Sequence, residues 1–224
     1  MQWLTRLLTR NKGFIVFMLG MLVFRSAVAD WNVVPTGSMQ PTIRIGDRIL
    51  VDKAAYDVRL PFTHISLLHL ADPQRGDIVV LDSSAAGERL VKRVVGIPGD
   101  TVALRHNQLY VNGRYASYQP MKVEGIRDDR EDPALYAVET VGSLRHAVRW
   151  SLAAQGHTSD FGPVTVPTGR YLLLGDNRDN SADSRYFGFF SRREITGRAT
   201  RVVVSLDPGD HYLPRSDRWG VALQ

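Results

Sequence analysis

The stretch RLVKRVVGIPGD, Arg89 to Asp100, shows how this chain is built. Branched apolar residues, which favour extended backbone, dominate its first part, and a Pro-Gly-Asp turn follows at once. Alternation along a strand places Leu90, Lys92 and Val94 on one face. The stretch therefore predicts a β-strand that ends in a tight turn and carries one lysine on an otherwise apolar face.

The same pattern recurs on both sides of this stretch. Short apolar segments alternate with turn signals that contain Gly-Asp, Asn-Gly or Pro-Gly. One stretch, Ser143 to Gly156, instead predicts a helix with a serine cap and a glycine stop. We therefore expect a mostly-β domain. The expected strands are Arg48–Val51, Asp77–Leu81, Arg89–Ile97, Thr101–Leu104, Gln108–Gly113, Arg170–Gly175 and Arg198–Leu206.

An apolar segment near the N-terminus allows two interpretations. Basic residues precede the run Gly13 to Phe24, which reaches about 17 residues when extended to Ala29, the short end of a membrane-spanning helix. A basic start, a short apolar run and Ala27-Val28-Ala29 also fit a cleavable signal peptide. The flanking charges disfavour a buried core helix. By the positive-inside rule, both interpretations export residues 30–224.

Composition excludes several classes of site. The 224 residues carry a net charge of +5, but the basic residues are scattered and no basic block is interleaved with aromatics. Nucleic-acid binding is therefore not expected. The chain has no cysteine, which excludes thiol nucleophiles, disulfides and thiolate metal sites. We expect no cofactor and no metal.

A serine lies in a restricted backbone in VVPTGSMQPT, Val33 to Thr42. Prolines restrict the chain on both sides of Ser38, and Gly37 leaves room beside the hydroxyl. A nucleophilic serine needs a group that takes its proton, usually a histidine. None of the six histidines lies in a fixed turn motif or in a cluster with aspartate. Each histidine is therefore expected at the surface or in a loop.

Lysine is the other candidate base, and the chain has only four lysines. A lysine acts as a base when burial lowers its pKa, because desolvation disfavours the charged form. Lys92 lies in an apolar strand, whereas Lys53 follows an aspartate that would stabilise its charge. Lys122 borders a charged stretch, and Lys12 precedes the apolar segment. Lys92 is the expected base, although a strand lysine taken alone more often lies at the surface.

A third polar motif, GDNRDNSADSRYFG, spans Gly175 to Gly188 and follows an apolar strand. Its spacing lacks the central glycine and the terminal glutamate of an EF-hand calcium loop. The motif is either a solvated surface turn or a polar network that satisfies its own hydrogen bonds. Its mixture of arginine and aspartate favours the network, which would hold a neighbouring group in place.

These three stretches, in this order, resemble the type I signal peptidases, the membrane-bound serine endopeptidases of peptidase family S26. PTGSMQPT resembles the family's nucleophile box, RGDIVVL and KRVVGIPGD its next two boxes, and GDNRDNSADSR its last box. The resemblance spans roughly Phe24 to Gly188, except Met121 to Pro167. It implies coiled antiparallel β-sheets, an N-terminal transmembrane helix, and the unmatched stretch as an inserted cap region.

The resemblance also implies a Ser–Lys dyad. Ser38 would attack the scissile carbonyl, and neutral Lys92 would take its proton and later protonate the leaving amine. The Ser38 N–H and the Thr36 hydroxyl would stabilise the oxyanion. The implied supporting residues are Ser181, which would hydrogen-bond and orient the lysine, and the pair Asp183 and Arg185.

The implied substrates are the signal peptides of exported preproteins, bound as an added β-strand and cleaved after small residues in an Ala-X-Ala pattern. The implied location is the bacterial cytoplasmic membrane, with a cytoplasmic N-terminus, a catalytic domain on the outer (periplasmic) side, and the secretion translocon nearby. Ser38 follows Ala29 by nine residues, at most about 30 Å. This short distance favours an anchor that keeps the serine at the membrane, where the apolar stretch Leu60–Pro73 either contacts lipid or packs internally.

The expected division of the chain follows from this resemblance. Residues 1–12 are expected in the cytoplasm and residues 13–29 as a single anchor, although many relatives have two membrane helices and a larger cap. Residues 30–120 and 168–224 would form the catalytic β domain, with residues 121–167 as the cap. Ala27-Val28-Ala29 is also a candidate self-cleavage site.

Two other functions fit parts of the pattern. A self-cleaving Ser–Lys regulator of the SOS-repressor type shares the fold class, but it would be cytoplasmic and usually carries a DNA-binding domain. An inactive membrane-anchored binding protein on the same scaffold would not need Ser38, Lys92 and Ser181 together. Both are less consistent with the apolar N-terminal segment and the intact candidate dyad.

Overall fold

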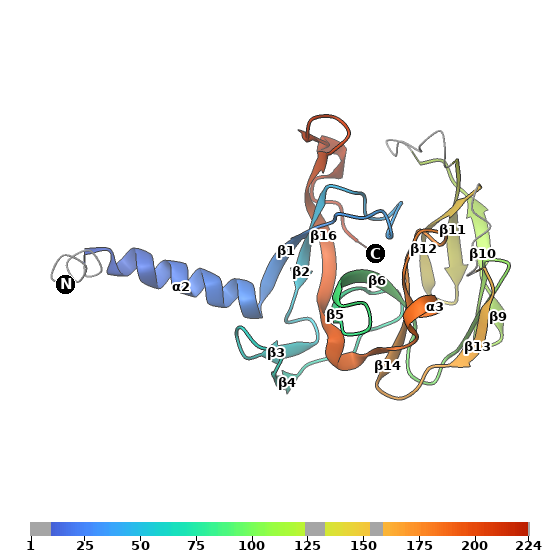
Figure 1. Cartoon of the computed structure of the whole chain (residues 1–224), viewed down its shortest axis with the longest axis horizontal. Coiled ribbons are helices and arrows are strands. Elements are labelled where there is room, and N and C mark those ends of the chain that lie inside the picture. The colour runs from blue at the N-terminus through green and yellow to red at the C-terminus, as the bar shows by residue number, and fades with distance from the viewer. Residues whose placement is uncertain (1–9, 124–132, 153–158, 224) are drawn as a thin grey trace.

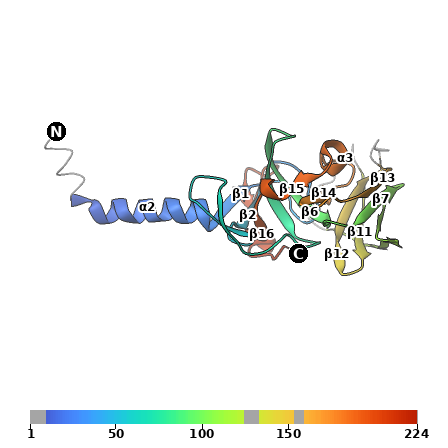
Figure 2. The same cartoon turned by 90° about the horizontal axis from the view of Figure 1, so that it is seen from below.

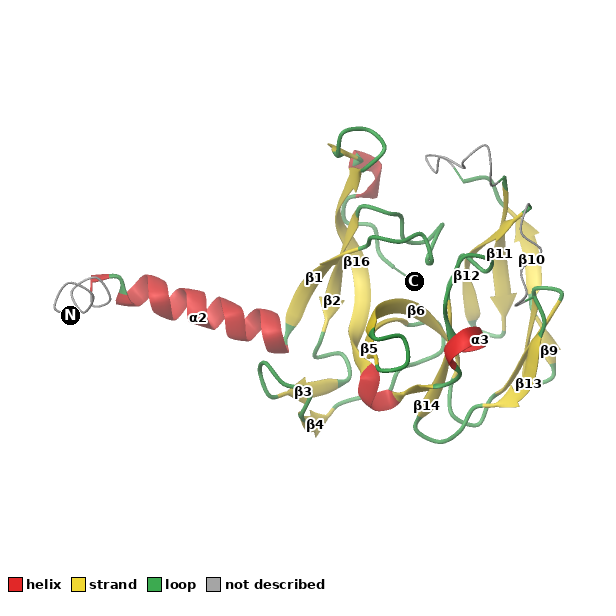
Figure 3. Cartoon of the chain, in the orientation of Figure 1, coloured by secondary structure: helices red, strands yellow, loops and turns green. Residues whose placement is uncertain are grey.

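The computed structural model describes residues 10–123, 133–152 and 159–223. Figure 1 shows a body made mostly of strands, from which one helix, α2 (Lys12–Ala27), projects. The view from below in Figure 2 shows the same projection. The secondary-structure colouring in Figure 3 makes the dominance of strands plain. The mostly-β prediction is therefore confirmed.

The largest sheet has eight strands, in the order β1-β2-β16-β5-β6-β14-β15, with β17 paired to β16. All pairings between these strands are antiparallel. The long strand β16 pairs with both β2 and β5 and has register shifts along each neighbour, so the sheet is irregular at its centre. The strands are β1 (Ala29–Val33), β2 (Asp47–Asp52), β5 (Ile78–Ser83), β6 (Glu88–Gly96), β14 (Arg170–Leu174), β15 (Phe190–Ser191), β16 (Ile195–Asp207) and β17 (Leu213–Pro214).

Three smaller antiparallel sheets complete the body, in the orders β13-β7-β8-β9, β10-β11-β12 and β3-β4. Their strands are β3 (Asp57–Arg59), β4 (Ser66–His69), β7 (Thr101–Arg105), β8 (Gln108–Val111), β9 (Arg114–Tyr115), β10 (Ser117–Pro120), β11 (Ala134–Val141), β12 (Leu144–Ser151) and β13 (Phe161–Thr165). The remaining short helices are α3 (Ser184–Phe187), η1 (Arg192–Glu194) and η2 (Ser216–Arg218).

Each of the seven predicted strands overlaps a strand of the structure, with ends that agree to within three residues. Their apolar residues fill three clusters of buried side chains, so the alternation read from the sequence reflects real packing. In β2, for example, Ile49 and Val51 are buried between more exposed neighbours. Burial of this apolar area is the main term that stabilises such a sheet, at about 25 cal/mol per Å².

The helix predicted over Ser143–Gly156 is wrong. Leu144–Ser151 forms strand β12, which pairs with all eight residues of β11. Gly142 adopts φ +60° in the turn between the two strands, so the following serine belongs to a hairpin turn and caps no helix. Leu144, His146 and Val148 are buried in alternation, the pattern of a strand. Cross-strand pairing has overridden a helical pattern of marginal strength. Residues 153–156 of this predicted helix lie outside the described residues.

Helix α2 carries apolar side chains on all sides and has no buried residue. Among the described residues, no helix has both the length and the apolar character that crossing a membrane requires.

The C-terminal end of α2 is fastened to the β body. Lys53 Nζ donates hydrogen bonds to the carbonyl of Arg25 (3.0 Å) and to Asp30 (3.3 Å). Arg25 in turn pairs with Asp30 at 2.6 Å. In addition, the backbone N–H of Phe62 donates to Ser26 Oγ at 2.7 Å. Helix and body are thus joined by several contacts in addition to the chain itself.

The apolar stretch Leu60–Pro73 does not pack internally. It contains β4 and the loop before it, and its large side chains are exposed by 42–71%. Because Phe62 lies within this stretch and contacts Ser26, the exposed apolar loop adjoins the end of α2. The exposed residues are Leu60, Phe62, Ile65, Leu67, Leu68 and Leu70.

Candidate active site

Lys92 and Ser38 meet although 54 residues separate them in the chain. Ser38 lies half-buried in the loop between β1 and β2, and Lys92 lies buried on β6. The Lys92 Nζ atom hydrogen-bonds the Ser38 hydroxyl oxygen at 2.8 Å. This distance suits direct proton transfer between the two groups.

Burial prepares Lys92 for a role as a base. The side chain is only 3% exposed. Burial lowers the pKa of Lys92 from 10.5 to about 8, and the negative charges of Asp183 and Glu88 oppose this shift only in part. A lysine with a pKa near 8 has a useful neutral fraction at physiological pH. The lysine predicted from its apolar strand is thus a buried group in contact with the serine.

The adjacent arginine on β6 has a different partner. Arg93 forms a two-pronged ion pair with Asp176, with Nε and Nη2 each 2.8 Å from a carboxylate oxygen. Both side chains are 1% exposed. The hydroxyl of Thr42, in the turn after Ser38, also donates to Asp176 at 2.5 Å. Asp176 therefore links strand β6, which carries Lys92, to the loop between β1 and β2, which carries Ser38 and is called the serine loop below.

The predicted supporting residues form a compact network. Ser181 Oγ donates to Asp183 Oδ2 at 2.8 Å, and Arg185 Nη2 approaches the same oxygen at 2.8 Å. Burial acts to raise the pKa of Asp183, but the hydrogen bonds and charge of Arg185 outweigh it, so the carboxylate stays ionised. Within the described residues, Ser181 bonds Asp183 and makes no hydrogen bond to Lys92. Its expected role in orienting the lysine stays a prediction.

Gly175 explains how these residues approach the serine. A Cβ atom at this position would lie 2.2 Å from Ser181 Oγ and 2.5 Å from the carbonyl oxygen of Ser38. Both distances are far below van der Waals contact, so only glycine fits between the two serines. Gly175 is therefore a point at which the motif GDNRDNSADSR approaches Ser38 closely through the backbone.

The proposed oxyanion donors lie beside the nucleophile in the chain. Thr36 is exposed to solvent. The N–H of Ser38 donates to no group among the described residues. Both groups are therefore available to a bound substrate.

A buried histidine was missed from the sequence. Four of the six histidines are exposed, as expected: His64, His69, His106 and His211. His157 lies in the range 153–158, outside the described residues. His146, on β12, is instead 5% exposed, and burial lowers its pKa to about 4. Its Nε2 lies 3.4 Å from Glu139 and 3.7 Å from Asp176. The alternation within β12 was the available signal, and the helical interpretation hid it.

Glu139 and Arg178 form the centre of this second cluster. Glu139 accepts from Arg178 at 2.5 Å and from the Tyr118 hydroxyl at 2.7 Å. Both charged side chains are completely buried. The cluster joins the β10-β11-β12 sheet to the polar motif after β14. That motif is therefore a buried network, as its composition favoured, and the surface-turn alternative is wrong.

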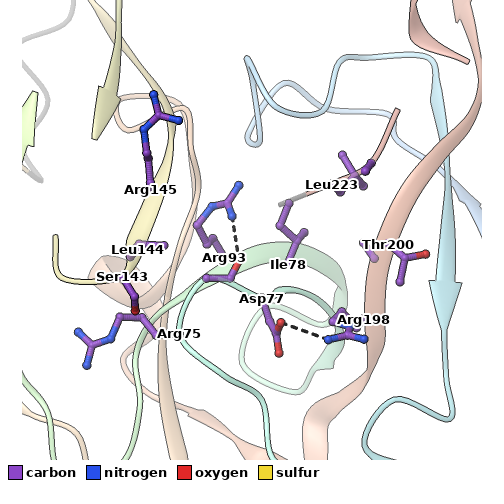
Figure 4. A pocket seen from close by; sticks show the side chains of 13 residues that line it. Arg75, Asp77, Ile78, Arg93, Ser143, Leu144, Arg145, Arg198, Thr200 and Leu223 are labelled. Carbon is purple, nitrogen blue, oxygen red and sulfur yellow. Dashed lines mark hydrogen bonds and ion pairs between the residues drawn. The ribbon is translucent and has the colours of Figure 1, made fainter. Parts of the chain in front are cut away.

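One cavity lies away from the dyad. It has a volume of about 630 Å³ and is bounded by the start of β5, the start of β12 and the middle of β16. Figure 4 shows arginines around it, with Arg198 paired to Asp77 at 3.6 Å. Neither Ser38 nor Lys92 lines it. Within the described part of the chain, no group of three or more His, Asp or Glu side chains is arranged so that it could hold a metal ion.

Comparison with known proteins agrees with this geometry. A family model described as "Signal peptidase, peptidase S26" matches residues 8–204. Signal peptidase I of Pseudomonas aeruginosa is 37% identical over 94% of this chain and 78% of its own length. Signal peptidase I of Pseudomonas fluorescens is 34% identical over the same shares.

Signal peptidases of two other bacteria are also similar to this chain. Signal peptidase I of Bacillus amyloliquefaciens is 32% identical over 85% of this chain and 84% of its own length. A crystal structure of signal peptidase I from Enterococcus faecalis aligns with a TM-score of 0.35 and 29% identity, covering 58% of this chain and 99% of the other. The family model spans most of the chain, and the two Pseudomonas proteins cover 94% of it. The chain therefore belongs to the signal peptidase family, peptidase S26.

Proposed function

We propose that this chain is a signal peptidase I, a serine endopeptidase that removes signal peptides from exported preproteins with a Ser–Lys dyad. The observation that carries the proposal is the 2.8 Å contact between the Ser38 hydroxyl and a buried lysine whose pKa is about 8. Family membership supplies the substrate class, and the contact supplies the chemistry.

The reaction follows from the groups in place. Ser38 Oγ attacks the scissile carbonyl while neutral Lys92 takes its proton, and the developing oxyanion is held by the Ser38 N–H and the Thr36 hydroxyl. The carbon–nitrogen bond then breaks, and Lys92 returns the proton to the leaving amine. A water molecule, deprotonated by Lys92, releases the acyl group and restores the serine. Asp183, Arg185 and Ser181 support the lysine.

Two open strand edges support binding of an extended substrate. In the described structure, β1 pairs only with β2, and β6 pairs with β14 only from Arg93 onward. One edge leads directly into the serine loop, and the other carries Lys92. A signal peptide added along these edges would satisfy their free backbone groups. Val34, Met39 and Val91 pack in one apolar cluster beside the dyad and would form a wall for small side chains.

The exposed apolar surfaces support a position at the membrane. All of α2 and the stretch Leu60–Pro73 present apolar side chains to their surroundings. We propose that residues 13–29 serve as the anchor and that the Leu60–Pro73 loop contacts lipid. The N-terminus would be cytoplasmic and the catalytic domain periplasmic, close to the translocon that delivers its substrates.

The domain division stays a proposal. Strands β11 and β12 fall within the range 121–167, whereas β10 (Ser117–Pro120) ends just before it. We propose the sheet of these three strands as the core of the inserted cap. Residues 124–132, in the charged stretch that Lys122 borders, lie outside the described residues.

A panel of variants tests the function. Purified wild-type protein in detergent should cleave a preprotein after a small residue, and Ser38→Ala and Lys92→Ala should each lose nearly all activity. Each His→Ala variant that folds should keep it, including His146→Ala. Full activity of Lys92→Ala, or loss in one folded histidine variant, would overturn the dyad. If neither the wild type nor any variant cleaves the preprotein, and the wild type instead cleaves its own chain, the self-cleaving regulator would be favoured.

A further inference from the structure

Asn177 lies between the serine loop and β12, and its two ends face different partners. Its backbone N–H donates to the Ser38 carbonyl at 3.1 Å, and its Nδ2 donates to the Gly37 carbonyl at 3.0 Å. The side chain is 1% exposed. One residue therefore holds the carbonyl groups on both sides of the nucleophile.

The contact with Gly37 also fixes the direction of the Ser38 N–H. The Gly37–Ser38 peptide is trans, because the cis bonds of the described chain lie elsewhere. In a trans peptide, the carbonyl and the N–H of the same plane point in opposite directions. With the Gly37 carbonyl held toward Asn177, the Ser38 N–H must point away from it. Among the residues that the structure describes, that N–H has no acceptor, so it is left free for a substrate oxygen.

Arg149, from β12, determines which end of the Asn177 amide faces Gly37. Its Nη1 donates to Asn177 Oδ1 at 3.2 Å. A guanidinium can only donate and a carbonyl can only accept, so both partners require the same orientation of the amide. Arg149 also pairs with this segment through its backbone: its N–H donates to the Asp176 carbonyl, and its carbonyl accepts from Arg178. The strand is thus docked independently of its side chain.

We propose that Asn177 and Arg149 are positioning residues that aim the Ser38 N–H at the oxyanion of the transition state. This inference rests on the proposed nucleophile and extends the site into β12. The local turn also contributes, because Gln40 N–H donates to the same Gly37 carbonyl at 3.0 Å. Asn177 adds the long-range constraint that a turn alone lacks, and Arg149 keeps its amide in the productive orientation.

The variant Asn177→Asp tests the proposal with almost no change in shape. It replaces the Nδ2 donor by an oxygen that repels the Gly37 carbonyl. We expect kcat to fall roughly ten- to a hundredfold, less than the 10²- to 10³-fold typical when a donor is deleted outright. KM should stay within about twofold, because the lost interaction acts mainly in the transition state. The matched control is Asn180→Asp, an exposed asparagine three positions along the same loop.

A second readout separates positioning from general damage. A peptide aldehyde forms a tetrahedral adduct with Ser38 and places an oxygen where the oxyanion develops. Its affinity should fall in parallel with kcat/KM in Asn177→Asp, whereas the affinity of the matching uncleavable peptide should not. The added carboxylate favours the charged form of Lys92 and can move the lower midpoint of the pH–rate profile only upward. The loss of kcat should therefore persist on the plateau above that midpoint, where Lys92 is neutral.

Arg149→Met provides the independent variant, since it leaves Asn177 intact. We expect a smaller loss of kcat, and we expect the double variant Arg149→Met/Asn177→Asp to be no worse than Asn177→Asp alone. The proposal is wrong if folded Asn177→Asp and Arg149→Met keep wild-type kcat, if only KM rises, or if the loss of kcat in Asn177→Asp disappears on the high-pH plateau. Full activity of Ser38→Ala would instead overturn the underlying proposed function, and no aldehyde adduct would then form on wild-type Ser38.

Discussion

At the residue scale, the candidate site depends on close approaches that tolerate no added atom. Gly175 lies between Ser181 and the Ser38 carbonyl, with room for a hydrogen only. Lys92 loses its hydration where it contacts Ser38, and this loss disfavours its charged form. Each residue can therefore be tested by a small change with a defined consequence.

Gly175→Ala should lower kcat/KM by more than tenfold. The new methyl group would lie 2.2 Å from Ser181 Oγ and 2.5 Å from the Ser38 carbonyl, so one of them must move. Gly20→Ala, in α2, is the control, because a Cβ there meets nothing within 4 Å. Peptide cleavage by both variants checks this. Wild-type activity in Gly175→Ala would show that the close approach is unimportant.

Lys92→Met should be inactive yet more stable than wild type at pH 7. Lowering the pKa from 10.5 to about 8 corresponds to up to about 3 kcal/mol of lost stability while the lysine is charged. The folded pKa lies below the unfolded one, so this destabilisation is complete below pH 8 and disappears as the pH rises past 10.5. The advantage of methionine should shrink over the same range. Unfolding of both proteins in detergent, followed with denaturant at several pH values, measures it. Equal stability at pH 7 would argue that Lys92 is well solvated.

Individual site residues could be predicted from the sequence only where they lay in a recognisable motif. Ser38 and Lys92 were paired from a restricted turn, an apolar strand and a family resemblance, and they are in contact. Asn177 lay inside a quoted motif, but nothing marked it among its polar neighbours. Arg149 lay in a stretch without recognisable motif. Their importance comes from hydrogen bonds to distant carbonyl groups, which a linear pattern does not encode.

At the element scale, β12 is where sequence and structure differ most. Its residues were predicted as helix, yet they pair with β11 and, through Arg149, with the segment after β14. A single-sequence pattern reports local preference, and here long-range pairing decided the outcome. The strands rich in valine and isoleucine were predicted well, because burial and local preference agree there.

Strand β1 also bears on the candidate self-cleavage site. Ala29 pairs with Asp52, and the Val28 carbonyl accepts from the backbone N–H of Lys53 at 2.9 Å. Asp30 is held by Arg25 and Lys53. Cleavage after Ala29 would require this strand to leave the sheet, so we expect the bond to survive in the folded enzyme.

Intact-mass measurement of purified protein during a long incubation tests that expectation. Wild type and Ser38→Ala should both keep the full chain. Loss of residues 1–29 from wild type alone would show self-cleavage at Ala29.

At the scale of the whole molecule, the dyad is assembled from segments that the chain brings together only by folding. The serine loop follows an edge strand, the lysine lies within the sheet, and the motif after β14 contacts both. The proposed anchor, the exposed Leu60–Pro73 loop and the open edges of β1 and β6 would together let the protein meet a signal peptide as it leaves the membrane. The order of boxes in the sequence predicted this assembly, and the docking of β12 onto it was not predicted.

The pH dependence of peptide cleavage tests the role of Lys92 most directly. Burial lowers the lysine pKa to about 8, and only the neutral amine can accept the Ser38 proton. The rate constant kcat/KM, measured from pH 5 to pH 10, should fall tenfold per pH unit below a midpoint near 8 and level off above it. A rate that stays flat down to pH 5 would contradict a lysine base.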